Sequence, residues 1–302
     1  MRHLGLGSLW FVMASGLIAV GGCGGGMPAA SAPPPVVPSN LVGNWLIAGS
    51  LPSLSAPVGT GVNLAMTFDV NGNKVVAAGF VILPCGSVRV SEEFGAVAVG
   101  TVAADGTFTA QFPTPTAGSL PSVSVSIQGT VPTASQGSWS GRYTVTNTGF
   151  ACSGTESGSF TAMPIQEVTG VYAGSLTLTQ LVTTGMATQT PVTMQVSLAQ
   201  GGAFGSPVTG KGEYSEATLK GSIKVQGTTC FASGTVSTAI PSAVEGDRVL
   251  ADFDMDDGSR MQILGTLEDV GASRVSVQLV QVSGGRCGSM TSFPTTEFVR
   301  QG

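Results

Sequence analysis

Apolar residues alternate with serine, threonine and glutamine at a period of two along much of this chain. The alternation is clearest in residues 107–112, 122–128, 138–145 and 192–198. A period of two directs apolar side chains to one face of a strand and polar side chains to the other. One buried face and one wet face are typical of antiparallel sheet. The pattern therefore predicts an all-β protein.

Composition excludes several other classes of protein. Charged residues make up 10% of the chain, glycine accounts for 44 of 302 residues, and the formal net charge is −5. Coiled coils contain far more charged residues, and disordered tails combine high charge with few β-branched residues. Because nucleic-acid binders carry basic surfaces, an acidic chain of this kind has no expected nucleic-acid partner.

Three glycine-containing turns support the antiparallel prediction. Asn71-Gly72 predicts a two-residue hairpin turn that places Asp69 opposite Lys74. The same turn would place Phe68 opposite Val75, and Asp105-Gly106 predicts another hairpin of this kind.

The third turn, Asp256-Asp257-Gly258, fits a three-residue loop with its glycine in the left-handed region. This loop would place Asp254 opposite Arg260 and Phe253 opposite Met261, so charges meet on one face and apolar groups on the other.

The N-terminus is typical of an export signal. Arg2 precedes an apolar stretch, residues 4–20, that is short for a membrane span. The stretch ends in Val20-Gly21-Gly22-Cys23, which resembles the lipobox of bacterial lipoproteins. The resemblance implies a signal peptide over residues 1–22 and a lipid on Cys23 that attaches the protein to the membrane. The alternative is an ordinary secretory signal followed by an incidental cysteine.

Residues 23–40 then form a Gly/Pro-rich tether. In bacterial lipoproteins an aspartate after the lipidated cysteine often retains the protein in the inner membrane, so Gly24 favours the outer membrane. Cleavage before Cys23 removes Arg2 and the lone histidine, His3, so the net charge falls from −5 to −6. The expected location is the cell envelope.

The four other cysteines and a weak internal similarity predict two tandem units, residues 41–165 and 166–302. Gly43-Asn44-Trp45 near the start of the first unit is echoed by Gly170-Val171-Tyr172 in the second. Four cysteines in an exported protein allow three disulfide connectivities. The repeat favours one bridge within each unit, Cys85–Cys152 and Cys230–Cys287.

Each unit has room for about eight short strands, which suits a closed up-and-down β-barrel. The early Gly-x-Trp of Gly43-Asn44-Trp45 resembles the first-strand signature of lipocalin-like barrels. In that family the tryptophan closes one end of the barrel and a late arginine packs on its ring. The resemblance implies that Tyr172 and Arg300 take these places in the second unit. The layout is also similar to uncharacterised Gly/Ser/Thr-rich surface lipoproteins, and tandem immunoglobulin-like β-sandwiches are the alternative fold.

Motifs for enzymatic chemistry are sparse. The predicted mature chain has no histidine, phosphate-binding loop or dinucleotide fingerprint, so we expect no cofactor. The carboxylates of residues 252–257 superficially resemble a calcium loop, but Asp257 occupies the place of its glycine and Ile263 that of its final glutamate. A solvated hairpin explains them better, and we expect no metal site. Glu92-Glu93 are expected to be exposed.

The aromatic residues Trp45, Trp139, Tyr143 and Tyr172 are candidates either for the core or for a ligand cavity. The sequence therefore favours a lipid-anchored, non-enzymatic binding or structural module whose partner is an unknown surface macromolecule. The alternative is a carrier of a small apolar ligand inside a lipocalin-like barrel. A carboxylate-dependent hydrolase is a third hypothesis, which rests only on the available Asp and Glu.

Overall fold

The computed structural model describes residues 36–51, 62–85, 88–93, 98–112, 123–147, 154–181, 187–201, 217–240, 242–294 and 296–302. This part of the chain is built from antiparallel strands and one short 3₁₀ helix, Pro38–Leu41. It contains no helix long and apolar enough to cross a membrane. The predicted all-β class is confirmed, with two closed barrels rather than sandwiches.

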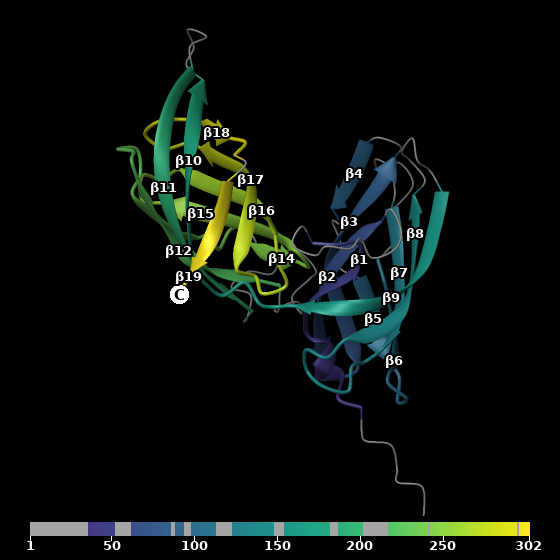
Figure 1. Ribbon diagram of the computed structural model, residues 1–302. Coiled ribbons are helices and arrows are strands. Elements are labelled where there is room, and N and C mark those ends of the chain that lie inside the picture. Colours follow the sequence, from purple (N-terminus) through teal and green to yellow (C-terminus); the bar gives the residue numbers. More distant parts are fainter. Residues whose placement is uncertain are drawn as a thin grey trace, which may run out of the picture. The chain divides into compact units, whose positions relative to one another are not determined.

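The first barrel runs from residue 43 to residue 165, and most strands that are neighbours in its wall are also neighbours in sequence (Figure 1). The wall closes because β1 pairs with both β2 and β9. Its strands are β1 (Gly43–Ala48), β2 (Asn63–Asn71), β3 (Lys74–Cys85), β4 (Val88–Glu93), β5 (Ala98–Val102), β6 (Thr107–Gln111), β7 (Val123–Thr130), β8 (Trp139–Asn147) and β9 (Gly154–Ile165).

The second barrel closes in the same way, because β10 pairs with β11 on one side and with β18 and β19 on the other. Its strands are β10 (Gly170–Leu181), β11 (Ala187–Gln200), β12 (Leu219–Gln226), β13 (Ser233–Val236), β14 (Ala243–Glu245), β15 (Arg248–Met255), β16 (Arg260–Leu267), β17 (Arg274–Ser283), β18 (Met290–Ser292) and β19 (Thr296–Gln301).

The two barrels share an interruption at the fourth position of the wall. In the first barrel β4 and β5 both pair with β3, and in the second β13 and β14 both pair with β15. The cysteines follow the same plan, since Cys85 ends β3 and Cys230 follows β12, the third strand of each barrel. The Cys230–Cys287 disulfide is present, as predicted. Cys152 lies outside the described residues, so the Cys85–Cys152 bridge stays a prediction.

The core of the first barrel is centred on Trp139. Its ring lies 5.0–5.9 Å, centroid to centroid, from the rings of Trp45, Phe68, Phe108 and Phe160, in edge-to-face arrangements. Aromatic pairs prefer this geometry because the positive ring edge meets the negative face. Gly129 admits the indole, since an added Cβ there would lie 2.6 Å from the Trp139 ring. Side chains therefore fill the barrel around this tryptophan.

The hairpin predictions have different outcomes. In the third hairpin Asp254 pairs with Arg260 and Phe253 with Met261, as predicted, and Gly258 has a φ of 82°.

The prediction for the first hairpin is wrong in register, because Asn71 pairs with Lys74 and leaves Gly72-Asn73 as the turn. Val70 then faces Val75. A shift by an even number of residues keeps every side chain on its face, so alternation alone does not distinguish the two registers.

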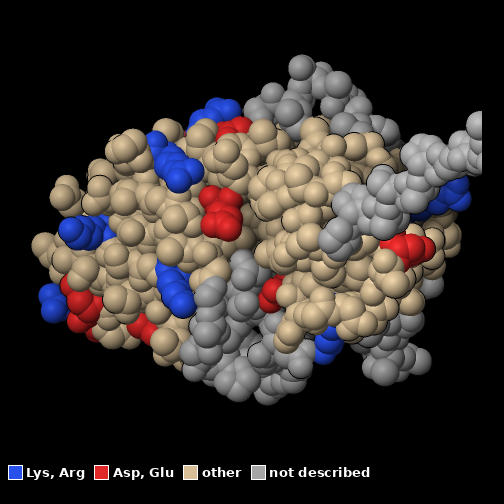
Figure 2. All heavy atoms as spheres, turned by 90° about the horizontal axis from the view of Figure 1, so that it is seen from below, with Lys and Arg blue, Asp and Glu red and all other residues tan. Residues whose placement is uncertain are grey.

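The outer surface carries few charges. Figure 2 shows a few scattered blue and red side chains on a face that is otherwise uncharged. Hydroxyl pairs join β8 to β9 on the exposed face of the first barrel, including Ser140 with Thr161 and Thr144 with Ser157. The predicted wet, low-charge face of the sheet is therefore confirmed for these strands.

Strand β1 is buried on both faces, which explains its nearly continuous apolar sequence. Trp45 and Ile47 belong to the core of the first barrel, whereas Leu46 belongs to a hydrophobic cluster with residues of the second barrel. Asn44 is fully buried beside them. Its side chain and that of Gln200 on β11 exchange two hydrogen bonds of 2.9 Å.

A second polar contact involves the β14–β15 hairpin. The Gly246 amide donates to Thr67 Oγ1 on β2 at 2.9 Å. Any side chain at residue 246 would meet backbone atoms, because an added Cβ would lie 2.3 Å from the carbonyl carbon of Ala65. The next residue, Asp247, is buried here, and its desolvation raises the pKa of its carboxyl to about 6.

Replacing Asp247 by asparagine should stabilise the protein at neutral pH. The carboxyl binds its proton more tightly in the folded state, so wild-type stability is fully present below pH ~4 and falls as the pH rises through about 6. The shift corresponds to about 3 kcal/mol. Urea unfolding should show Asp247→Asn to be more stable than wild type at pH 7, with the gap closing at pH 4.

The control is Asp105→Asn, because Asp105 is exposed and the hydrogen bonds from Thr107 lower the pKa of its carboxyl. This control variant should show no gain at pH 7. If the free energy of unfolding depended on pH in the same way for Asp247→Asn and wild type, the burial of this carboxyl would be contradicted.

Candidate functional site

The aromatic candidates from the sequence lie in the cores of the two barrels. Trp45 is fully buried and its indole Nε1 donates to the Leu41 carbonyl oxygen at 2.8 Å. Trp139 and Tyr143 are 4% and 2% exposed, and the Tyr143 hydroxyl donates to Glu156 at 3.4 Å. Tyr172 is 1% exposed in the second barrel. These residues build the barrels, which corresponds to the core interpretation of the sequence.

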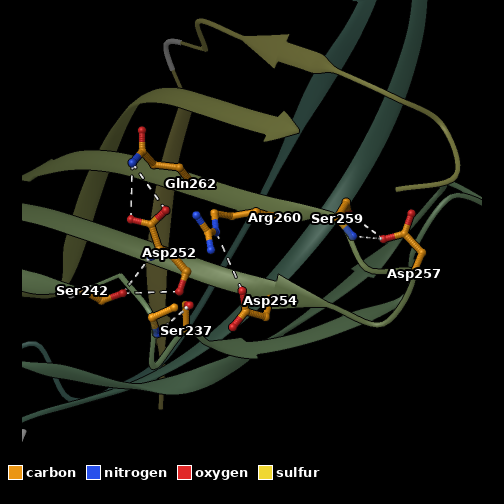
Figure 3. A network of polar contacts seen from close by, with 9 residues as sticks. Ser237, Ser242, Asp252, Asp254, Asp257, Ser259, Arg260 and Gln262 are labelled. Atoms are coloured by element: carbon orange, nitrogen blue, oxygen red, sulfur yellow. Dashed lines mark hydrogen bonds and ion pairs between the residues drawn. The ribbon is translucent and has the colours of Figure 1, made fainter. Parts of the chain in front are cut away.

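The carboxylates of the β15–β16 hairpin are each used in local contacts (Figure 3). Asp254 forms an ion pair with Arg260 at 3.8 Å, and Asp257 accepts hydrogen bonds from the amide and hydroxyl of Ser259. Asp256 accepts from the Ala232 amide. These contacts correspond to the hairpin interpretation of the cluster. The described residues contain no group of three or more metal-ligating side chains.

Asp252 differs from the prediction of a solvated face, because it is 1% exposed. Its backbone contacts Ser237 and Ser242, with the Ser237 amide donating to its carbonyl and the Ser242 hydroxyl accepting from its amide (Figure 3). Its carboxylate accepts from the Gln262 amide at 3.3 Å, and burial raises its pKa. Alternation in β15 could not reveal this, since Ser237, Ser242 and Gln262 come from other strands and connections.

Other candidates fall outside the described part of the chain. Cys23 and the residues before it are not described, and neither are the side chains of Glu92 and Glu93 in β4. The lipidation of Cys23 and the exposure of these two glutamates therefore stay predictions.

Gly43 and Gly170, the first residues of the two similar motifs, lie next to side chains that line a polar groove. An added Cβ at Gly43 would lie 3.1 Å from Gln136 Nε2, and one at Gly170 would lie 2.7 Å from Arg300 Nε. Arg300 also pairs with Tyr172 across β19 and β10. Gln136 and Arg300 both line an open groove of about 580 Å³. Its other lining residues are Pro164, Gln166, Glu167, Thr169, Val270 and Gly271.

The linker from β9 to β10 forms one wall of the groove, and its backbone is fixed by hydrogen bonds. The Gln166 amide donates to the Val270 carbonyl at 2.7 Å, and the Val168 amide donates to Gln200 Oε1 at 2.9 Å. Thr169 Oγ1 accepts a hydrogen bond from the backbone N–H of Gln200. A wall held in this way is already ordered before a ligand arrives, which lowers the entropic cost of binding.

The turn between β16 and β17 also lines the groove, through Val270 and Gly271. Asp269 holds this turn by accepting from the Ser273 amide and hydroxyl, at 3.0 and 2.7 Å. Partial burial acts to raise the pKa of the Asp269 carboxyl, but these bonds and the charge of Arg274 outweigh it and lower the pKa. Asp269 therefore stays ionised at neutral pH and keeps the turn closed.

Backbone strain accompanies this groove. Among the described residues, Gln136 and Ala272 are the two non-glycine residues with left-handed φ, at 60° and 47°. Gln136 lines the groove and Ala272 follows its lining residue Gly271. The surrounding structure compensates for part of the strain, since the Tyr172 hydroxyl donates to the Ala272 carbonyl at 2.8 Å. Strained residues of this kind concentrate at functional sites.

The groove also carries polar side chains that have no partner within the described chain. Gln136, Gln166, Glu167 and Arg300 are exposed, and their side chains form no hydrogen bond or ion pair with a described residue. By contrast, Arg260 and Arg274 in the same barrel form ion pairs. The groove can therefore donate and accept several hydrogen bonds to a ligand without first breaking its own.

Sequence reasoning missed three of these four side chains, because Gln136, Gln166 and Glu167 lie in connections without a periodic pattern. The only sequence signal for Gln166 and Glu167 is position, since residues 166–169 follow directly after the predicted boundary between the units, and Gln136 has no such signal. The resemblance to lipocalin-like barrels singled out Arg300, but as a partner of Tyr172 and not as a groove residue.

Neither a protein-family model nor a curated protein matches this sequence. Among solved structures, the chain is similar to a protein of unknown function from the DUF3598 family of Nostoc punctiforme PCC 73102. The identity is 9%, the TM-score is 0.26, and the match covers 87% of this chain and 97% of that one. The chain is also similar to kievitone hydratase from Nectria haematococca, at 8% identity and a TM-score of 0.23, over 87% of this chain and 90% of that one.

The prediction that this chain is not an enzyme is corrected by the second likeness, because kievitone hydratase is an enzyme by its name. The absence of histidine from residues 4–302 and of the motifs named above excludes particular reaction mechanisms and leaves other chemistry open. At these TM-scores neither likeness carries an activity or a ligand over to this chain.

Proposed function

We propose that this protein is a lipid-anchored binding module of the cell envelope, and that the groove lined by Gln136, Glu167 and Arg300 holds its ligand. The observation that carries the proposal is a set of polar side chains without partners among the described residues, placed on walls that hydrogen bonds already fix. The volume of about 580 Å³ is in the range of small-molecule sites. The described interior around Trp139 is filled by rings, so the outer groove is favoured over a cavity there.

Binding is tested by native mass spectrometry of the full chain exported by a bacterial host and released from its envelope. We expect a non-covalent adduct of a small polar molecule on the wild type. The double variant Gln136→Ala/Arg300→Ala should lose the adduct, because it removes one groove-lining donor from each barrel. The matched control Arg142→Gln replaces an exposed arginine on β8 outside the groove and should keep it. A wild type without adduct, or equal adducts on all variants, would contradict binding in the groove.

The anchor is tested separately by Cys23→Ser. A serine cannot take the thioether-linked lipid, so the variant should leave the membrane fraction, while the wild type stays with it until detergent is added. The measurement is the distribution of the protein between membrane and soluble fractions. A serine variant that still sediments with membranes would show that Cys23 is not the anchor.

A further inference from the structure

We infer that the groove selects a short zwitterionic peptide, with its carboxylate on Arg300 and its free ammonium on Glu167. This inference rests on the proposed function and names the ligand class of the same groove. It begins from the charges, since one cation and one anion line the same groove and neither is neutralised by a described residue. Two opposite charges kept apart in one groove call for a ligand that carries both.

Ligands with a single charge fit less well. An anion would gain from Arg300 but would face Glu167 and an acidic chain, and a cation would gain from Glu167 but would face Arg300. A zwitterion satisfies both groups at once. The guanidinium of arginine suits a carboxylate in particular, because its planar fork donates two parallel hydrogen bonds.

The neutral lining fits a peptide backbone. Gln136 and Gln166 each offer an amide that both donates and accepts, which matches the alternating carbonyl and amide groups of a peptide. Pro164 and Val270 supply apolar surface beside them. A groove of about 580 Å³ is larger than one amino acid needs and holds roughly two to four residues.

Arg300 is also positioned for this contact. Its aliphatic stem lies against Gly170, where an added Cβ would come 3.4 Å from Cγ and 3.5 Å from Cδ. Gly170 has a φ of 139°, a region that other residues rarely adopt. The motif glycine therefore leaves the room that the arginine side chain occupies, and the β19 backbone is fixed by the Arg300 amide donating to Ser273.

Isothermal titration calorimetry of the full chain with three probes tests the inference. The probes are trialanine, N-acetyl-trialanine, which lacks the ammonium, and trialanine amide, which lacks the carboxylate. Trialanine should bind at least about tenfold more tightly than either blocked peptide, because each blocked end loses one charge-assisted contact.

Two variants test which residue binds each end of the peptide. In Arg300→Gln, trialanine and trialanine amide should bind equally, since the carboxylate has lost its partner. In Glu167→Gln, trialanine and N-acetyl-trialanine should bind equally. The control Arg142→Gln should keep both preferences. Equal binding of the three probes to the wild type, or no binding of any, would overturn the peptide inference. If native mass spectrometry still finds a groove-dependent adduct in that case, the proposed function survives with a ligand of another class.

Discussion

Replacing Trp139 by alanine should lower the free energy of unfolding by about 4 kcal/mol, among the largest effects of any core substitution in this chain. The indole touches four other aromatic rings, so its removal leaves a cavity that the rigid barrel wall cannot close. Its Nε1 has no hydrogen-bond partner within the described chain, so the loss comes from packing alone. Urea unfolding followed by circular dichroism measures it.

The conservative variant Trp139→Phe keeps most of the ring contacts and forfeits no hydrogen bond, so it should cost clearly less than the alanine variant. Phe293→Ala is the surface control, because this ring is 79% exposed and its removal should change stability by less than about 0.5 kcal/mol. A loss for Trp139→Ala no larger than that of Phe293→Ala would show that the ring cluster does not hold the barrel together.

Removing the Cys230–Cys287 disulfide should cost about 4 kcal/mol in the chain-entropy model, because the bridge spans 57 residues and restricts the unfolded chain. The bridge links the connection after β12 to the connection between β17 and β18. The double variant Cys230→Ala/Cys287→Ala should therefore unfold at lower urea concentration than the oxidised wild type. Alanine is preferred to serine because Cys230 is 8% exposed and a hydroxyl there would need a partner.

Reductant provides the internal control for the disulfide. It should destabilise the wild type and have a smaller effect on the double variant, in which only the predicted Cys85–Cys152 bridge remains to be reduced. If reductant has no further effect on the double variant, the predicted second bridge contributes nothing to stability. A double variant as stable as the oxidised wild type would contradict the role given to the observed bridge.

Much of the fold was predictable because a period of two encodes which face of each strand is buried. Val192, Met194, Val196 and Leu198 are all buried, as their alternation predicts. Closure into barrels followed from the number of strands. The third hairpin was predictable in detail because only one loop length lets Phe253 face Met261 and keeps charges together.

The errors arose where the sequence pattern leaves the answer open. The observed register of the first hairpin differs from the predicted one by two residues, which leaves every side chain on the same face of the sheet. The sequence around Asn71 therefore does not distinguish the two registers. Asp252 is buried among Ser237, Ser242 and Gln262, which come from other strands and connections, and this is a tertiary effect. The groove was hidden for a similar reason, because Gln136 and Glu167 are brought to one place by contacts between residues far apart in the sequence.

The most direct test of the groove is an amide NMR titration of the full chain with trialanine. The account predicts shift changes at residues 134–137, 166–170, 270–273 and 299–301, together with the loss of these changes in Arg300→Gln. The strands that carry Trp139 and Phe253 inside the barrels should stay unchanged. Shift changes centred on the barrel interiors, or none at the groove residues, would contradict the account.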